Sequence, residues 1–288
     1  MSTPRLAALA ALLLSACEGE LVVDLTDAPV DGASRVQLQL SAIELLASDG
    51  SVTTIEPDVP ESFDMLDYRD GATLRVLGAD GELDGTYIGL RLRFDDDDAY
   101  LRKDGSSVPI ELLSAGDHAS VDLTLDGSAS VALIVDLDLR FSLTDAVDTH
   151  GVYQMVPVIR VVDADTAGSI EGTIDTDAIA DGDCREGRAL GEGVAVYLYP
   201  GSGVTPADYY DDGSASTLVQ PVGSADVAYV SASDRWTWRF AYVAPGSYTV
   251  AWTCEADAEH AREDDALLFR ASADVTVTEA QTSSVEFP

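Results

Sequence analysis

The alternating stretch that decides the fold reads Val131-Ala132-Leu133-Ile134-Val135-Asp136-Leu137-Asp138-Leu139-Arg140-Phe141. Its odd-numbered positions are all apolar, whereas its even-numbered positions turn polar from Asp136 onward. Successive side chains of a β-strand point to opposite faces of a sheet, so the pattern predicts a strand with its odd-numbered side chains in a core. We therefore expect Asp136, Asp138 and Arg140 on a face that water covers.

Two further stretches, residues 36–41 and 90–94, alternate in the same way. Asp-Gly pairs, which favour tight turns between antiparallel strands, separate such runs along the chain. A long helical period is absent from the sequence, and only residues 62–68 are expected to form a turn of helix. The pattern predicts an all-β protein built from β-sandwiches.

A domain boundary is predicted near residues 164–169. Residues 156–162 have the composition of a last strand, residues 163–168 are a short polar link, and residues 168–174 begin a new strand. We therefore expect two β-sandwich domains in tandem, at residues 17–165 and 166–288. The link is too short to let the two domains move far apart.

The N-terminus has the features of a secretory signal. A basic residue precedes an apolar run, Leu6–Leu14, that is about half as long as the roughly 20 residues of a membrane-spanning helix. The run ends in Leu14-Ser15-Ala16-Cys17, which resembles the lipobox of bacterial lipoproteins. The resemblance implies a signal peptide at residues 1–16 and a lipid on Cys17 that anchors the protein to a membrane. Glu18, in place of Asp, favours the outer membrane of the cell envelope. The alternative is an ordinary signal with a chance cysteine.

The other two cysteines, Cys184 and Cys254, form an even pair. In an oxidising envelope such a pair predicts a disulfide. Two free buried thiols are the alternative. A zinc site has little support, because His260 is the one histidine near Cys254 in the sequence.

Charge excludes one class of partner. Asp and Glu total 52 against 16 Lys and Arg, which gives a net charge of −36. Such a surface repels nucleic acid and anionic lipid, so we expect no nucleic-acid binding. We interpret the acidity as an adaptation to saline surroundings, with specific cation binding as the alternative.

Calcium is the cation that clustered carboxylates favour. The strongest candidate ligands are Asp95, Asp96, Asp97 and Asp98, for which a solvated turn is the competing interpretation. Weaker candidates are Asp24 with Asp27 and Asp31, and Asp163 with Asp165. For Asp27 we favour a turn residue that precedes Pro29 and accepts hydrogen bonds from nearby amides.

Large aromatic side chains mark one strand of the second domain. Trp236, Trp238 and Phe240 share one face, which predicts core packing. The alternative is an exposed platform for sugar rings, for which Trp236 and Tyr242 are the candidate ligand-binding residues.

Catalytic motifs are absent from the sequence. Its histidines, His118, His150 and His260, lie far apart, and no Gly-x-Ser-x-Gly elbow or phosphate-binding Gly-Lys-Ser/Thr loop occurs. We therefore expect that the protein is not an enzyme.

Four segments of the first domain resemble the bacterial domain-of-unknown-function family 4382. They are Leu25-Thr26-Asp27-Ala28-Pro29, Phe63–Asp67, Tyr87–Leu92 and Val156–Asp163, and they cover roughly residues 20–165 in the order of that family. The resemblance implies a secreted or lipid-anchored β-domain and implies no activity.

The second domain resembles carboxypeptidase-regulatory, prealbumin-like sandwiches. The resemblance rests on Gly168–Ile174 and Ala244–Val250 and implies a supporting, non-catalytic module. Together these observations predict a lipid-anchored envelope protein with a structural, adhesive or extracellular ligand-binding role, assisted by Ca²⁺ if its Asp clusters bind one. Its expected partners are the membrane, through the lipid, and an extracellular glycan or protein. The alternative function is a carbohydrate-binding module that uses the aromatic residues of the second domain.

Overall fold

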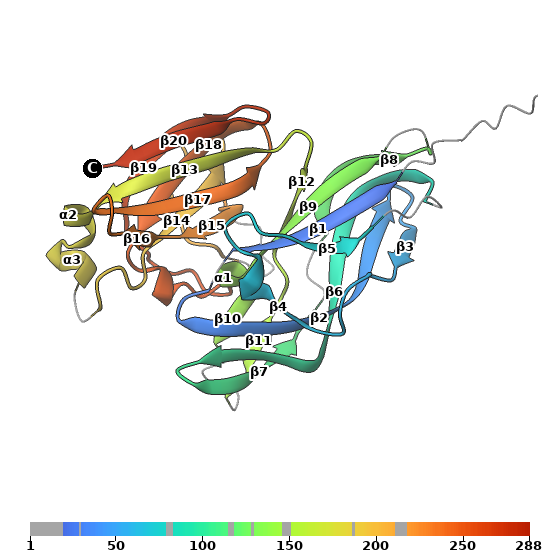
Figure 1. The fold of residues 1–288 in the computed structure, drawn as a ribbon, viewed down its shortest axis with the longest axis horizontal. Helices are drawn as coiled ribbons and strands as arrows, with labels where there is room; N and C mark the ends of the chain where they lie inside the picture. Colours follow the sequence, from blue (N-terminus) through green and yellow to red (C-terminus); the bar gives the residue numbers. More distant parts are fainter. Residues whose placement is uncertain are drawn as a thin grey trace, which may run out of the picture.

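The computed structural model describes residues 20–28, 30–78, 83–114, 118–127, 130–145, 151–185, 188–210 and 218–288 (Figure 1). Strands through Asp163 pair with one another, and strands from Gly168 onward pair with one another. We call these two parts the N-terminal half and the C-terminal half. The described chain is almost all β, which confirms the predicted fold class.

Two sheets form the N-terminal half. The first has the order β12-β9-β1-β5 and the second the order β10-β11-β7-β6-β2-β3, with β4 paired to β2 and β8 paired to β6. Their bounds are β1 Leu21–Ala28, β2 Ala33–Ala47, β3 Val52–Ile55, β4 Phe63–Asp64, β5 Leu74–Leu77, β6 Gly85–Lys103, β7 Ser106–Leu112, β8 Ala119–Leu125, β9 Val131–Asp138, β10 Leu143–Asp145, β11 Tyr153–Met155 and β12 Ile159–Asp163. The short helix η1, Met65–Tyr68, confirms the turn of helix expected there.

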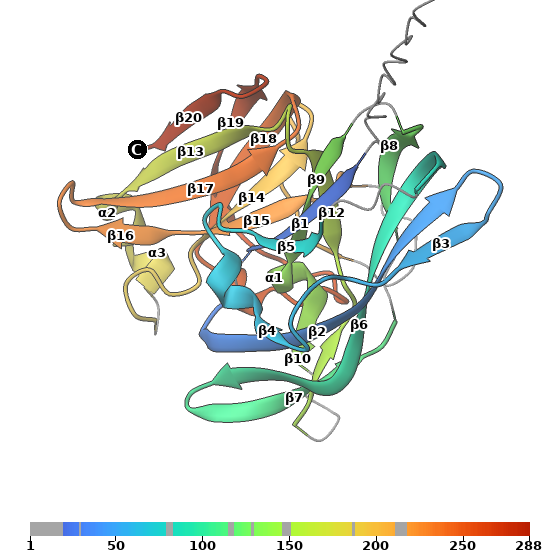
Figure 2. The same ribbon diagram turned by 45° about the vertical axis from the view of Figure 1, so that its right-hand side comes forward.

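The C-terminal half is a sandwich of two four-stranded sheets (Figure 2). One has the order β16-β17-β13-β20 and the other the order β15-β14-β18-β19. Their bounds are β13 Gly168–Asp175, β14 Ala195–Pro200, β15 Gly223–Asp226, β16 Ala228–Val230, β17 Arg235–Val243, β18 Gly246–Thr253, β19 Phe269–Val277 and β20 Thr282–Phe287, with short helices α2 Thr176–Ile179, α3 Gly182–Arg185 and η2 Ala256–Ala258. A core that includes Trp238, Phe240, Val250 and Trp252 lies between them, which confirms core packing for this aromatic face.

Strand β9 carries the stretch that predicted the fold. It pairs in parallel with β1 and antiparallel with β12, and Leu133, Val135 and Leu137 are buried in the core. The strand ends at Asp138, whose side chain accepts a hydrogen bond from the Phe141 amide and caps the short helix α1, Leu139–Ser142. The alternation therefore holds to Leu137 and then gives way to a helical turn.

The expected solvent face of this stretch is wrong. Asp138 is only 4% exposed and Arg140 only 3%. Both side chains bond to β15 of the C-terminal half, so this polar face lies against other protein groups. Alternation showed that the face is polar, but could not show that a second sandwich covers it.

Strand β14 is buried on both faces. Val196 and Leu198 belong to the core of the C-terminal sandwich, whereas Ala195, Tyr197 and Tyr199 pack in a separate cluster with Phe141 from the N-terminal half. A strand covered on both sides reads as a continuous apolar run, as this one does. The ring of Phe141 stacks on Tyr209 with centroids 4.6 Å apart and meets Tyr197 edge-on at 5.3 Å.

Candidate functional site

A buried polar network joins the two halves. Arg140 forms ion pairs with Asp31 at 3.1 Å and with Asp226 at 3.0 Å, and its Nη1 donates to Ser224 Oγ at 2.9 Å. The Ser224 hydroxyl and amide in turn donate to the carboxylate of Asp138. We call these five residues the junction network. Asp31, Asp138 and Arg140 belong to the N-terminal half, whereas Ser224 and Asp226 belong to β15 of the C-terminal half, so the network fixes the two halves against each other.

Burial controls the ionisation of this network. It raises the pKa of Asp138 to about 6, even though the charge of Arg140 and the hydrogen bonds from Ser224 and Phe141 lower it. The pKa of Asp226 is raised for the same reason, against the influence of Arg140. The guanidinium of Arg140 therefore favours the ionised forms of both Asp138 and Asp226.

A second set of contacts joins the two halves beside the junction network. Tyr242 donates from its hydroxyl to the Gly71 carbonyl at 2.9 Å, and its own carbonyl accepts from Arg160. Arg160 also pairs with Asp136. At Gly71, where φ is +93°, an added Cβ would lie 3.3 Å from the Ala241 side chain, so this turn sits tightly against β17.

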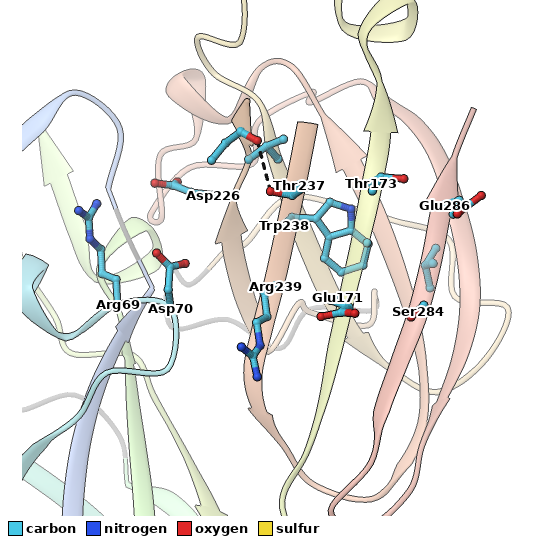
Figure 3. A pocket seen from close by; sticks show the side chains of 14 residues that line it. Arg69, Asp70, Glu171, Thr173, Asp226, Thr237, Trp238, Arg239, Ser284 and Glu286 are labelled. Carbon is cyan, nitrogen blue, oxygen red and sulfur yellow. Dashed lines mark hydrogen bonds between the residues drawn. The ribbon is translucent and has the colours of Figure 1, made fainter. Parts of the chain in front are cut away.

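A groove of about 740 Å³ opens along this junction (Figure 3). Its floor is the outer face of β17, β13 and β20, where Arg239 lies opposite Glu171, and Thr237 opposite Thr173. Arg69 and Asp70, from the turn after η1, form the wall on the N-terminal side. We call this the junction groove, and its polar lining residues are Arg69, Asp70, Glu171, Thr173, Asp226, Thr237, Arg239, Ser284 and Glu286.

One indole lies directly beneath the groove. Trp238 is buried, and a Cβ added at Gly172 would meet its ring at 2.2 Å. A larger residue at position 172 would therefore collide with the ring of Trp238, which Figure 3 shows next to β13. The fluorescence of Trp238 should therefore respond to a ligand that lies over Gly172.

Three carboxylates of the C-terminal half meet next to Tyr197 of β14. Asp208, Glu259 and Asp265 offer oxygens that all lie within 4.8 Å of one another, and they are the one such group among the described residues. Glu259 Oε2 accepts from the Tyr197 hydroxyl at 2.7 Å, whereas its buried Oε1 has no hydrogen-bond partner. We call this the carboxylate cluster. Its donor set suits a hard cation such as Ca²⁺.

The carboxylate cluster predicts a pH-dependent stability. Burial, aided by Asp208 and Asp265, raises the pKa of Glu259 from 4.5 to about 8. The folded protein thus retains a proton that the unfolded chain releases, so stability falls as pH rises from about 4.5 to about 8. Glu259→Gln should remove this loss and raise the free energy of unfolding at pH 8.5 by about 2–4 kcal/mol without added metal. Urea unfolding of both proteins at pH 5 and pH 8.5 measures the difference.

Asp96→Asn is the matched control, because it removes one exposed carboxylate from β6. It should change stability by less than about 0.5 kcal/mol at either pH. A Glu259→Gln protein whose stability difference from the wild type is the same at both pH values would show that Glu259 ionises normally.

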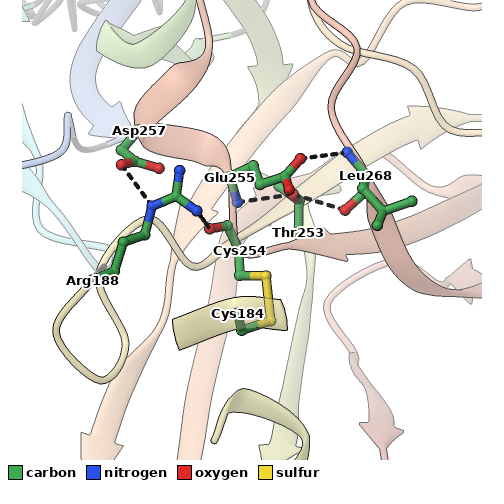
Figure 4. The surroundings of a disulfide bond; sticks show 7 residues. All are labelled: Cys184, Arg188, Thr253, Cys254, Glu255, Asp257 and Leu268. Atoms are coloured by element: carbon green, nitrogen blue, oxygen red, sulfur yellow. Dashed lines mark hydrogen bonds and ion pairs between the residues drawn. A yellow bond between two sulfur atoms is a disulfide. The ribbon is translucent and has the colours of Figure 1, made fainter. Parts of the chain in front are cut away.

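The predicted disulfide is present. Cys184 of α3 and Cys254, directly after β18, are joined with their Cα atoms 5.4 Å apart (Figure 4). Arg188 donates to the Cys254 carbonyl at 3.1 Å and pairs with Asp257. The bond therefore fastens the segment between β13 and β14 to the end of β18.

Three other sequence-predicted groups of acidic residues are not part of the groove lining. Asp95, Asp96, Asp97 and Asp98 lie in β6 and are exposed, and they do not gather three carboxylates within 4.8 Å. Calcium binding there stays a prediction. Asp24 pairs with Arg75, and Asp31 pairs with Arg140, so these two do not share a site with Asp27; Asp163 accepts from the Asp165 amide in a local turn.

The predicted aromatic pair does not form one platform. Trp236 is 8% exposed and packs against Tyr229 and over Gly191. A bulge in β17 shifts its register against β13 beyond Phe240, so Tyr242 turns away from the aromatic face toward the N-terminal half. Sugar binding by these two residues stays a prediction. Cys17, the predicted site of lipid attachment, lies outside the described residues.

Fold and site together define an all-β protein of two joined sandwiches with a polar groove at their junction. Residues 18–157 match the family described as Domain of unknown function (DUF4382), so this part of the chain is a DUF4382 domain. The match ends at residue 157, so the resemblance of the second domain to carboxypeptidase-regulatory sandwiches stays a prediction.

Three solved structures show remote similarity. A leucine-rich repeat protein from Bacteroides thetaiotaomicron is 12% identical with a TM-score of 0.23, over 94% of this chain and 26% of that one. The fimbrial anchor protein Mfa2 from Porphyromonas gingivalis is 9% identical with a TM-score of 0.21, and the match covers 89% of this chain and 83% of that one. A fimbrial protein from Bacteroides ovatus is 10% identical with a TM-score of 0.19, and the match covers 94% of this chain and 48% of that one. The chain thus spans about a quarter of the first protein's length.

No curated protein matches this chain. Within the described residues, none of the helices combines the length and the apolar character that crossing a bilayer requires.

Proposed function

We propose that this protein is a non-catalytic component of the cell envelope, anchored by lipid at Cys17, that binds a neutral extracellular oligosaccharide in the junction groove. The observation that carries the proposal is the groove itself. Its wall comes from the N-terminal half and its floor from the C-terminal half, and the buried junction network holds the two in register. A site built in this way is preorganised, which lowers the entropic cost of binding.

The chemistry of the groove favours a polyol. Donors from Arg69 and Arg239 alternate with acceptors from Asp70 and Glu171, and hydroxyl groups such as Thr173 lie between them. Each sugar hydroxyl both donates and accepts, so such a lining can satisfy several neighbouring hydroxyls. The net charge of −36 repels anionic ligands, which leaves neutral or cationic ones.

Tryptophan fluorescence tests this function. Neutral oligosaccharides titrated into the full chain should produce a saturable change in emission, because Trp238 lies beneath the groove. Arg239→Ala should weaken binding about tenfold or more, since hydrogen bonds to a charged group contribute about 1.5–3 kcal/mol. Arg102→Ala, at an exposed arginine of β6 outside the groove, should leave affinity unchanged.

Several outcomes would contradict the proposal. Binding of basic peptides but no sugar would assign the groove to a protein partner. Equal weakening by both arginine substitutions would show that the sugar does not bind in the groove. Release of new reducing ends from a bound sugar would show that the protein is catalytic.

Calcium assistance is the second part of the proposal. The carboxylate cluster supports it better than Asp95–Asp98, because its oxygens already converge. A cation bound there would tie the loop that holds Asp208 to the loop that holds Glu259 and Asp265. Calcium should then restore the stability that the wild type loses at pH 8.5, and it should have a smaller effect on Glu259→Gln.

A further inference from the structure

Asp27, near the end of β1, is a buried carboxyl group without a hydrogen-bond partner among the described residues. It is 6% exposed, and both of its oxygens are unpaired. The expectation that nearby amides would donate to it is therefore wrong. An ionised carboxylate without a partner is very costly to bury, and such a group takes up a proton instead.

The side chain of Asp27 lies where the two halves meet. It lines a cavity of about 30 Å³ together with Asp136 of the N-terminal half and Asp226 of the C-terminal half. Gly71 and Tyr242 also line this cavity, and the Tyr242 hydroxyl donates to the Gly71 carbonyl there. Separating the two halves would therefore break this hydrogen bond and bring water to Asp27.

The lining of this cavity does not fit a metal ion. Within the part of the chain that the structure describes, only the carboxylate cluster brings three carboxylate oxygens within 4.8 Å of one another. The cationic Arg239 also lines the cavity at Asp27. A proton on Asp27 removes the buried charge and needs no further ligands.

The nearest charged groups favour the neutral form of Asp27. Burial raises the pKa of Asp27 well above its usual range, and the negative charges of Asp136 and Asp138 raise it further. Asp226 acts in the same direction, whereas Arg69 lowers the pKa only in part. An ionised Asp27 would thus be a buried charge next to other negative charges.

The other charged groups on the elements around Asp27 are engaged elsewhere or exposed to water. Three arginines form ion pairs with other aspartates, and three further groups are exposed. The arginines are Arg75 of β5, Arg140 of α1 and Arg160 of β12, and the exposed groups are Asp67 of η1, Asp70 of the turn that follows it and Arg239 of β17. The described residues therefore provide no ion pair for Asp27.

We propose that the contact between the two halves is a proton-dependent switch, which is closed while Asp27 carries a proton and opens when Asp27 ionises. Opening would loosen the junction groove, because its wall and its floor belong to different halves. The proposal does not depend on sugar binding, and it concerns a different place from the carboxylate cluster.

The direction of the switch follows from where the proton is held. The closed form retains the proton of Asp27, whereas the opened form, in which water reaches the side chain, releases it near the usual pKa of 3.8. Each pH unit between these two pKa values therefore favours opening by up to about tenfold. The contact is tight in acid and loosens as pH rises.

Hydrogen–deuterium exchange of the full chain tests the proposal. The amide of Ser224 in β15 donates to Asp138 of the other half, so its exchange reports opening. Asp27→Asn keeps the size of the side chain but has no proton to release. The exchange rate of β15 in the wild type, divided by that in Asp27→Asn at the same pH, should rise by about tenfold or more from pH 5 to pH 9. The same ratio for β3, at the edge of the second sheet, should stay constant.

Two variants serve as controls. Asp96→Asn removes one exposed carboxylate and should keep the full pH response of the wild type. Tyr242→Phe removes the hydrogen bond to Gly71 without changing a charge at these pH values. It should speed the exchange of β15 about 2–10-fold by the same factor at both pH values, since one hydrogen bond contributes about 0.5–1.5 kcal/mol.

Infrared spectroscopy detects the proton directly. The experiment uses Glu259→Gln at pH 7, because this variant lacks the carboxyl group whose pKa is about 8, and Asp138, whose pKa is about 6, is mostly ionised there. The C=O band of a protonated carboxyl group should be present in Glu259→Gln and absent from Glu259→Gln/Asp27→Asn. If Asp27→Asn does not fold, the band in Glu259→Gln alone decides whether a buried proton is present.

Three results would overturn the proposal. The first is an exchange ratio for β15 that changes by less than about twofold from pH 5 to pH 9. The second is an equal rise in β15 and β3, which would indicate that repulsion among the acidic residues loosens the whole protein. The third is a Glu259→Gln protein without the band of a protonated carboxyl group.

Discussion

Replacing Arg140 by alanine should lower the free energy of unfolding by about 3 kcal/mol and the melting temperature by roughly 6–12 °C. The guanidinium side chain is 2% exposed and bonds to Asp31, Asp226 and Ser224. Removing Arg140 deprives Asp31 and Asp226, whose side chains are 27% and 42% exposed, of their common cation. It also removes the positive charge that lowers the pKa of the buried Asp138, and burying a charge without its partner is costly. Because these contacts join the halves, the variant should also lose their coupling. Differential scanning calorimetry should show two overlapping transitions in place of one.

Arg75→Ala is the matched control for this prediction. Arg75 also pairs with an aspartate of the N-terminal half, Asp24, at 2.9 Å, but its side chain is 60% exposed. Exposed ion pairs contribute about 0–1 kcal/mol, so this variant should melt within a few degrees of the wild type. Equal losses in the two variants would mean that Arg140 contributes no more than a surface pair. Addition of Asp226→Asn to Arg140→Ala should recover part of the loss, since it removes one of the unpaired charges.

The sequence predicted the positions of the strands better than it predicted which groups cover their faces. Alternation identified the strand of Leu133, Val135 and Leu137, and it identified the polar face that carries Asp138 and Arg140. It assigned this face to water because a polar side chain alternates in the same way whether it meets solvent or a second sandwich. Contacts between residues more than 80 positions apart, such as Arg140 with Asp226, leave no local pattern.

Local sequence patterns were also limited in predicting the candidate sites. The disulfide was predictable because only two cysteines remained once the lipobox resemblance accounted for Cys17. The carboxylate cluster was not, since Asp208 and Glu259 are far apart in a chain with 52 acidic residues. A bulge in β17 reversed the direction of Tyr242, and one inserted residue is invisible to a two-residue period. Asp27 had a local explanation, the turn before Pro29, that the structure does not support.

The disulfide should stabilise the C-terminal half mainly through the unfolded chain. Its two cysteines are separated by 70 residues. In the chain-entropy model, closing a loop of that length stabilises the folded state by about 4 kcal/mol. In the folded state, the side chains of Ile179, Cys184 and Val194 place the segment between β13 and β14 in the core. Loss of the bond should therefore loosen this segment before it affects the sheets.

The double variant Cys184→Ala/Cys254→Ala should accordingly lose about 4 kcal/mol of unfolding free energy and melt roughly 8–16 °C lower than the wild type. Replacing both cysteines avoids a buried unpaired thiol at Cys254, which is fully enclosed in the core. Urea unfolding under oxidising conditions measures the loss, and limited proteolysis should cut first between β13 and β14. A reductant should bring the wild type to the same midpoint and leave the variant unchanged, which separates the effect of the bond from that of the substituted side chains. A variant within about 1 kcal/mol of the oxidised wild type would show that the short helices and the Arg188–Asp257 pair hold this segment without the disulfide.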